Sequence, residues 1–150
     1  MQLYFDANAL IQAVEKSDRE AHAFADIIQG ASRQGLKCVS SELSLAELLV
    51  VPLRNADLPL IAAFSNLLSG TGDAQFFTVP VSRDVLLQAA RIRAEGGQGL
   101  KLPDAIHLAT AELSGCTHII SGDKRLSRHT RLPVWDPIGA DLPAFIGLLS

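Results

Sequence analysis

Four acidic residues, Asp6, Glu47, Asp104 and Asp123, occupy positions from which a fold can bring their carboxylates together. Carboxylates gathered at one point repel one another and lose hydration, so such a group needs a cation among its members. Oxygen ligands without clustered Cys or His select hard ions, which makes Mg²⁺ or Mn²⁺ the expected metal. Because such an ion polarises a phosphoryl oxygen and activates water, the predicted chemistry is hydrolysis of phosphodiester bonds.

Two of these acids follow predicted strands. Asp6 ends a strand predicted over residues 2–6, and Asp123 comes one glycine after a strand predicted over residues 117–121. In parallel sheets the active residues gather beyond the carboxyl ends of the strands. Both carboxylates are therefore expected at the same edge of the sheet.

The other two acids lie on predicted helices. Asp104 falls in the first turn of a helix that Pro103 opens, where the helix dipole favours a carboxylate, and Glu47 has apolar neighbours in sequence. Each acid also has a purely structural interpretation. Asp104 can be a helix-capping charge, Asp123 a turn residue, Asp6 a helix start and Glu47 a solvent-facing side chain. Their joint placement at one end of one sheet favours the catalytic interpretation.

Short predicted strands alternate with predicted helices along the chain. Strands are expected at residues 2–6, 36–40, 76–79, 117–121 and 134–135. Helices are expected from Ala9 to about Ser17, from Asp18 to about Ile28, from Ser41 to just before Pro52, from Asp57 to about Leu68, from Ser82 to about Ala94, and from Pro103 to about Leu113. The alternation predicts an α/β fold of three layers, in which a short central parallel sheet is flanked by helices on both faces.

Length and composition narrow the class of protein further. A chain of 150 residues, 48% of them hydrophobic, is expected to form a single domain over residues 1–150. No signal peptide or long apolar run is recognisable, so we expect a soluble, cytoplasmic protein without a membrane partner. Cys38 and Cys116 are expected to be buried free thiols. With a net charge of −3, any nucleic acid must be held locally rather than by a general positive field.

Several polar residues beside the acids are candidates for supporting roles. Lys101 and Arg125 flank the predicted acidic site and are the best candidates for phosphate contacts, although an ordinary solvated loop explains them equally well. Asn8 and Ser121 are candidates for contacts to phosphate or to the metal-binding carboxylates. His107 lies in an otherwise apolar helix, where a hydrogen-bonded core or pocket-wall histidine is expected rather than a metal ligand.

Four segments of the chain look like the four motifs of the PIN-domain family, in order. They are Tyr4-Phe5-Asp6-Ala7-Asn8-Ala9-Leu10-Ile11, Leu45-Ala46-Glu47-Leu48, Leu102-Pro103-Asp104-Ala105-Ile106-His107-Leu108-Ala109-Thr110-Ala111 and Ser121-Gly122-Asp123-Lys124-Arg125-Leu126. A fifth segment, from Val134 to Pro137, resembles the closing strand of the family. Leu126 departs from the pattern, because an aromatic residue is frequent there.

This resemblance implies both an activity and partners. The expected activity is Mg²⁺- or Mn²⁺-dependent endonucleolytic cleavage of RNA, with Asp6, Glu47, Asp104 and Asp123 as the metal site. Many relatives are VapC-type toxins that are paired with a small antitoxin protein and form homodimers. Other relatives process RNA without an antitoxin, so the toxin role and the processing role both stay open.

Two further interpretations compete with the nuclease. A phosphatase with Asp6 as nucleophile fits a similar alternating fold, but a haloacid-dehalogenase-like enzyme would carry a second aspartate where this chain has Asn8. A catalytically silent scaffold that binds RNA or protein would not need all four acids. Neutralising Asp6 separates the interpretations, because only the nuclease loses cleavage of RNA.

Overall fold

A computed structural model describes residues 1–15, 35–69, 76–97 and 99–136. Its centre is a five-stranded sheet with the strand order β3-β2-β1-β4-β5, and every neighbouring pair is parallel. The strands are β1 (Gln2–Phe5), β2 (Lys37–Ser41), β3 (Phe76–Val79), β4 (His118–Ile120) and β5 (Val134–Trp135). The predicted parallel sheet is confirmed, and β1 lies at its centre.

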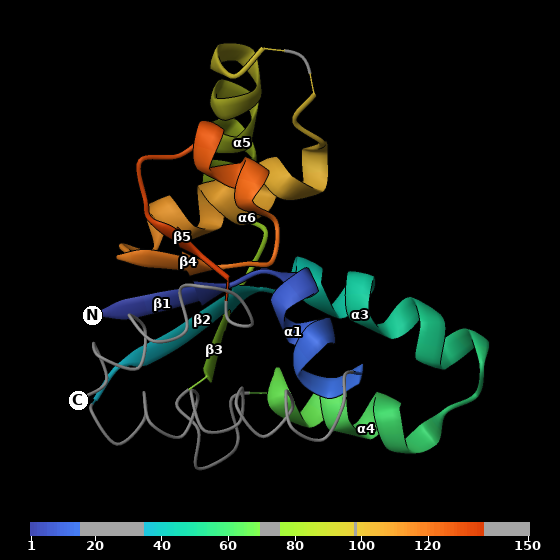
Figure 1. Cartoon of the computed structure of the whole chain (residues 1–150). Helices are drawn as coiled ribbons and strands as arrows, with labels where there is room; N and C mark the ends of the chain where they lie inside the picture. The colour runs from blue at the N-terminus through green and yellow to red at the C-terminus, as the bar shows by residue number, and fades with distance from the viewer. Residues whose placement is uncertain (16–34, 70–75, 98, 137–150) are drawn as a thin grey trace.

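Helices cover both faces of the sheet, as predicted (Figure 1). One side carries α1 (Ala7–Glu15), α3 (Leu43–Arg54) and α4 (Leu58–Leu67), and the other carries α5 (Arg83–Glu95), α6 (Leu102–Leu113) and the 3₁₀ helix η1 (Lys124–Arg128). The core consists of two hydrophobic clusters, one on each face of the sheet, because successive side chains of a strand point to opposite faces. Phe5 packs with the first group of helices, while the next-door Tyr4 packs with the second.

Local capping explains where several helices begin. The Asp57 carboxylate accepts the amide of Leu60 at 3.2 Å, and the Ser82 hydroxyl accepts the amide of Val85 at 3.3 Å. Each bond satisfies an amide that has no partner within its own helix. The predicted starts of α4 and α5 are therefore confirmed, as is the position of Pro103 in the first turn of α6.

The predicted start and end of α3 are wrong. Its last turn continues through Pro52 to Arg54. The proline ring is fully buried, and this packing offsets the backbone hydrogen bond that proline cannot donate. At the other end, Ser41 is the last residue of β2 and does not occupy the cap position. Its hydroxyl nevertheless accepts the amide of Leu43 at 3.1 Å, so it stabilises the first turn.

The remaining differences are small. Strand β4 is shorter than predicted by one residue at each end, and β2 is displaced by one residue toward the C-terminus. The helix predicted from Asp18 to about Ile28 lies outside the described residues. Cys38 and Cys116 are free and buried, and burial raises the pKa of each thiol to about 12. No helix in the described part of the chain is long and apolar enough to cross a membrane.

Candidate active site

Asp6 directly follows β1, the central strand, and is only 6% exposed. Its Oδ1 accepts the amide of Ala9 at 2.9 Å, which caps the start of α1, and its Oδ2 accepts the hydroxyl of Ser121 at 2.5 Å. Burial raises the pKa of the Asp6 carboxyl, although both hydrogen bonds act in the opposite direction. Asp6 is therefore a carboxylate that the fold holds in one position at a cost in solvation.

Ser121 connects the two acids that leave neighbouring strands. It follows β4 and is fully buried, and its amide donates to the carbonyl of Trp135 at 3.0 Å. Its hydroxyl donates to Asp6 and accepts the amide of Asp123 at 3.0 Å. The side chain of Ser121 thereby fixes the position of the carboxylate that follows β1 and stabilises the turn that follows β4.

Glu47 is held by His107, whose buried ring also contacts the hydroxyl of Tyr4. Its Oε1 lies 2.6 Å from Nε2 of His107, and Nδ1 of the same imidazole lies 2.6 Å from the hydroxyl of Tyr4. In a neutral imidazole facing an ionised carboxylate, Nε2 carries the proton and Nδ1 accepts from the tyrosine. His107 is 3% exposed and hydrogen-bonded on both ring nitrogens, which confirms the predicted hydrogen-bonded core histidine. It fixes Glu47 on α3 relative to α6.

Asp104 lies in the first turn of α6 and is partly buried. Its pKa is raised, first by burial and then by the negative charge of Asp123, with a smaller contribution from Glu47. The charge of Asp104 in turn raises the pKa of Asp6. Asp104 therefore interacts electrostatically with each of the other three acids.

Asp123 has the opposite electrostatic setting. It caps η1, and both of its carboxylate oxygens accept from the guanidinium of Arg125, at 2.9 and 3.0 Å. These hydrogen bonds lower the pKa of Asp123. Arg125 itself is 82% exposed, so this bidentate pair lies at the surface.

A cavity of about 250 Å³ opens where Asp104 and Asp123 approach each other, and Lys101 and Arg125 also line it. Asp6 and Glu47 stand outside its lining. Among the described residues, no three Asp, Glu, His or Cys side chains lie close enough to hold one metal ion. Glu47 is bonded to His107 and Asp123 to Arg125. The four-carboxylate metal site therefore stays a prediction, supported by the all-oxygen donor set and its mutual repulsion.

The other predicted site residues divide into two groups. Ser121 makes direct contact with Asp6, whereas Lys101 and Arg125 share the cavity with Asp104 and Asp123. Asn8 is exposed in the first turn of α1, and its side chain makes no hydrogen bond to another described residue.

Tyr4 is the residue at this site that sequence reasoning missed. The sequence places it only in the motif around Asp6, but its hydroxyl lies 2.6 Å from Nδ1 of His107 on α6, the helix against which Tyr4 packs. Strand alternation carries the missed signal. Tyr4 precedes Asp6 by two positions and therefore points to the same face of the sheet.

The fold and the site together define a class of protein: a parallel α/β domain with coupled acids at the carboxyl ends of its central strands. Within that class, the family model described as "PIN domain" matches residues 3–132. The chain belongs to the PIN domain family.

Solved structures of similar fold come from bacterial toxin–antitoxin systems. VapBC2 from Rickettsia felis, bound to a promoter DNA fragment, matches with a TM-score of 0.70 and 12% identity, over 90% of this chain and 98% of its own. A toxin–antitoxin complex from Klebsiella pneumoniae matches with a TM-score of 0.64 and 24% identity, over 90% of this chain and 97% of its own. VapC20 from Mycobacterium tuberculosis is described as a toxin that cleaves the sarcin-ricin loop. It matches with a TM-score of 0.62 and 15% identity, over 83% of this chain and 92% of its own. No curated protein sequence matches the chain.

Proposed function

We propose that the chain is a Mg²⁺- or Mn²⁺-dependent endoribonuclease and the toxin of a toxin–antitoxin pair, acting in the cytoplasm. The observation that carries the proposal is the electrostatic coupling of four acids at the edge where β1 and β4 end. Asp6 is buried there and has its pKa raised, and the pKa of Asp104 is raised by burial and then by the charges of Asp123 and Glu47. Among the four acids Arg125 hydrogen-bonds to Asp123 alone, so a hard divalent cation would supply the counter-charge that the group as a whole shares.

Each of the four acids has a definite part in this proposal. Asp6, Glu47, Asp104 and Asp123 would hold the cation. When bound, the ion polarises the phosphodiester and activates water. Ser121 keeps Oδ2 of Asp6 in place through its hydroxyl, and His107 keeps Oε1 of Glu47 in place. Both contacts reduce the reorganisation needed when substrate arrives.

The cations beside the acids provide the contact to the nucleic-acid backbone. Lys101 and Arg125 line the same cavity as Asp104 and Asp123, and the exposed guanidinium of Arg125 has room to turn from Asp123 toward a phosphate. The exposed Asn8 is the further candidate for contact with phosphate, whereas the fully buried Ser121 acts through Asp6. Cleavage of RNA is carried over from VapC20 and its described action on the sarcin-ricin loop.

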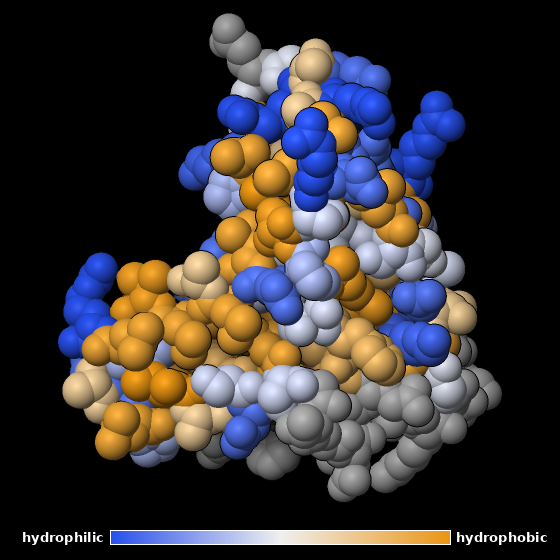
Figure 2. Space-filling view, turned by 180° about the vertical axis from the view of Figure 1, so that it is seen from behind, coloured by the Kyte–Doolittle hydropathy of each residue, from blue (hydrophilic) through white to orange (hydrophobic). Residues whose placement is uncertain are grey.

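Partner binding has a separate structural support. Large apolar side chains are exposed where α3 ends and α4 begins: Val50, Val51, Leu53 and Leu58. Figure 2 shows this end of the molecule as an apolar projection, at the left of that view. Exposed apolar groups of this kind mark protein contacts. We assign the surface to the antitoxin or to a second copy of the chain. A small open reading frame immediately upstream of the gene is expected.

The apolar face of α4 itself is mostly used inside the molecule. Phe64 and Leu68 are buried, and Leu60 and Leu67 pack against the same hydrophobic cluster. Core packing therefore accounts for these four residues.

Cleavage of a labelled structured RNA by the purified protein tests the proposed activity. Wild type is incubated with Mg²⁺, Mn²⁺ or EDTA beside Asp6→Asn and a control, Asp84→Asn, which makes the same change at an exposed position of α5. We expect metal-dependent cleavage by wild type and by the control, and a loss of nearly all cleavage in Asp6→Asn. Equal inertness of all three proteins after removal of any bound partner would favour the scaffold. Release of phosphate from a small ester without cleavage of RNA would favour the phosphatase.

A further inference from the structure

A second, larger cavity of about 570 Å³ lies beside the acidic one. The two cavities share Arg128 and His129 as lining residues, so a strand bound at the acids can continue into the larger cavity past these side chains. The volume lies within the range of about 300–1,000 Å³ that is typical of small-molecule pockets. None of the four acids lines this cavity.

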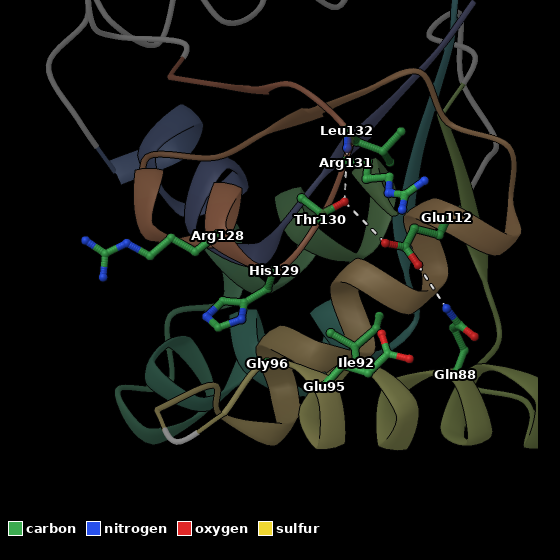
Figure 3. Close-up of a pocket in the computed structure, with 10 residues that line it drawn as sticks. All are labelled: Gln88, Ile92, Glu95, Gly96, Glu112, Arg128, His129, Thr130, Arg131 and Leu132. Carbon is green, nitrogen blue, oxygen red and sulfur yellow. Dashed lines mark hydrogen bonds between the residues drawn. The ribbon is translucent and has the colours of Figure 1, made fainter.

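One wall of the larger cavity is a built hydrogen-bond network (Figure 3). Oε2 of Glu112 accepts from the side-chain amide of Gln88 at 3.0 Å, and Oε1 accepts from the hydroxyl of Thr130 at 3.2 Å. These contacts join α5, α6 and the segment after η1. A carboxylate has about four acceptor positions, so the fixed Glu112 retains capacity for a ligand.

His129 forms the boundary between the cavities, and its ring is closely packed. Its Nδ1 is buried and has no hydrogen-bond partner among the described residues. A Cβ added to Gly96 would lie 2.7 Å from that atom, so the absence of a side chain at Gly96 gives the ring its place. Ile92 and Leu132 add apolar lining. An imidazole edge with apolar surroundings suits a flat aromatic ligand.

The charged groups of the cavity indicate which aromatic ligand fits. Glu112 supplies acceptors, and the exposed Arg131 supplies donors; neither Arg131 nor Arg128 pairs with a carboxylate in the described part of the chain. Guanine offers two neighbouring donors, N1–H and N2–H, on one edge and two acceptors, O6 and N7, on another. Adenine places a donor where guanine has O6, which would face the guanidinium.

The geometry points to this cavity as a base-specific subsite that takes a guanine of the RNA strand, a few nucleotides at most from the cleaved bond. Glu112 binds the donors of the base, Arg131 binds its acceptors, and His129 borders its face. Arg128 stands where the backbone passes between the cavities. This inference rests on the proposed function, because it takes the strand held at the acids to be RNA.

Equilibrium binding in EDTA tests the subsite without any cleavage. Three labelled oligouridines are compared by fluorescence anisotropy: one with a single central guanosine, one with adenosine there and one with uridine only. Wild type is expected to bind the guanosine strand about tenfold more tightly than the adenosine strand. Inosine, which lacks the N2 amino group, should lose part of this preference.

Two variants and one control locate the preference. Glu112→Gln and Arg131→Gln should each abolish the discrimination between guanosine and adenosine. The control Arg54→Gln makes the same change as Arg131→Gln but at the far end of α3, and it should retain the discrimination. Unchanged thermal unfolding of each variant shows that the fold is intact.

Equal affinity of wild type for the guanosine and adenosine strands would overturn the inference, and so would undiminished discrimination in both cavity variants. The outcome is separable from the nuclease proposal. Guanine-dependent binding without any cleavage would keep the subsite and remove the activity, whereas cleavage without base preference would do the reverse.

Discussion

Asp6 and Asp123 leave neighbouring strands at one edge of the sheet, but their surroundings differ in kind. Asp6 is buried, fixed by an amide and a hydroxyl, and has a raised pKa. Asp123 lies in a surface turn, paired with an exposed guanidinium that lowers its pKa. The end of β1 is therefore preorganised by the core, whereas the turn after β4 is held by a contact that solvent and ligands can reach.

The largest expected effect compares the two acids directly. Asp6→Asn should reduce RNA cleavage about 10³-fold, because its position is fixed by the core and no neighbouring carboxylate can replace it. Asp123→Asn should cost nearer tenfold, because the turn can adjust and Arg125 is released to bind phosphate. Single-turnover rates at saturating Mg²⁺ measure both. Equal losses would remove the distinction between a fixed and an adjustable acid.

The next largest effect concerns Ser121, the link between the two regions. Ser121→Ala removes the donor to Asp6 and the acceptor for the amide of Asp123, so it should lower the free energy of unfolding by about 1–3 kcal/mol. Urea denaturation measures this loss. Ser127→Ala is the matched control, because its exposed hydroxyl bonds only to a local carbonyl. A similar small change in both variants would mean that the hydroxyl of Ser121 stabilises nothing.

A pH dependence should distinguish the buried acid. Because the folded state raises the pKa of Asp6, the folded chain binds more protons than the unfolded one between the ordinary carboxyl pKa and the raised value. The contribution of Asp6 to stability therefore falls as pH rises through that interval. In EDTA at neutral pH, Asp6→Asn should melt about 2–4 °C above wild type.

This melting difference should disappear in acid, where the wild-type carboxyl is protonated in both states. A constant difference at every pH would assign the effect to packing. A variant less stable than wild type at neutral pH would contradict the cost assigned to burial of the charge.

The smallest effect is expected at the surface pair. Arg125→Gln should leave the melting temperature unchanged, since exposed ion pairs contribute little. It should instead raise the pKa of Asp123 toward the ordinary carboxyl value, because the largest cause of its lowering is lost. Carboxyl chemical shifts followed through a pH titration measure the change, with Arg54→Gln as control. An unmoved pKa would mean that the guanidinium does not hold this carboxylate.

Local sequence patterns predicted the individual strands and helices more accurately than the features that depend on how these elements pack together. The strand Phe76–Val79 was predicted at its observed limits, and the helix ending at Leu113 was predicted within one residue of its observed start, because the signals for these elements act within a few residues. Pro52 was misjudged because its buried ring depends on tertiary packing. The strand order likewise depends on how the crossovers pack, which no single segment encodes.

The candidate site shows the same limit. Their positions after predicted parallel strands placed Asp6 and Asp123 at one edge, and the structure has them there, joined through Ser121. The hydrogen-bond partners of the carboxylates were harder to predict from the sequence, because His107 contacts Glu47 across 60 positions of sequence. The larger cavity had no sequence signal, since Gln88 and Glu112 resemble ordinary surface residues of helices.

The central place of β1 has a consequence for the order of events during synthesis. Its partner β2 follows closely, but the bond between Asp6 and Ser121 spans 115 positions. At roughly 5–20 residues per second, translation separates the two residues by roughly 6–23 seconds. A growing chain therefore carries its first acid long before the opposite half of the edge exists. The complete edge, with Asp6 bonded to Ser121, forms only after Ser121 has been synthesised.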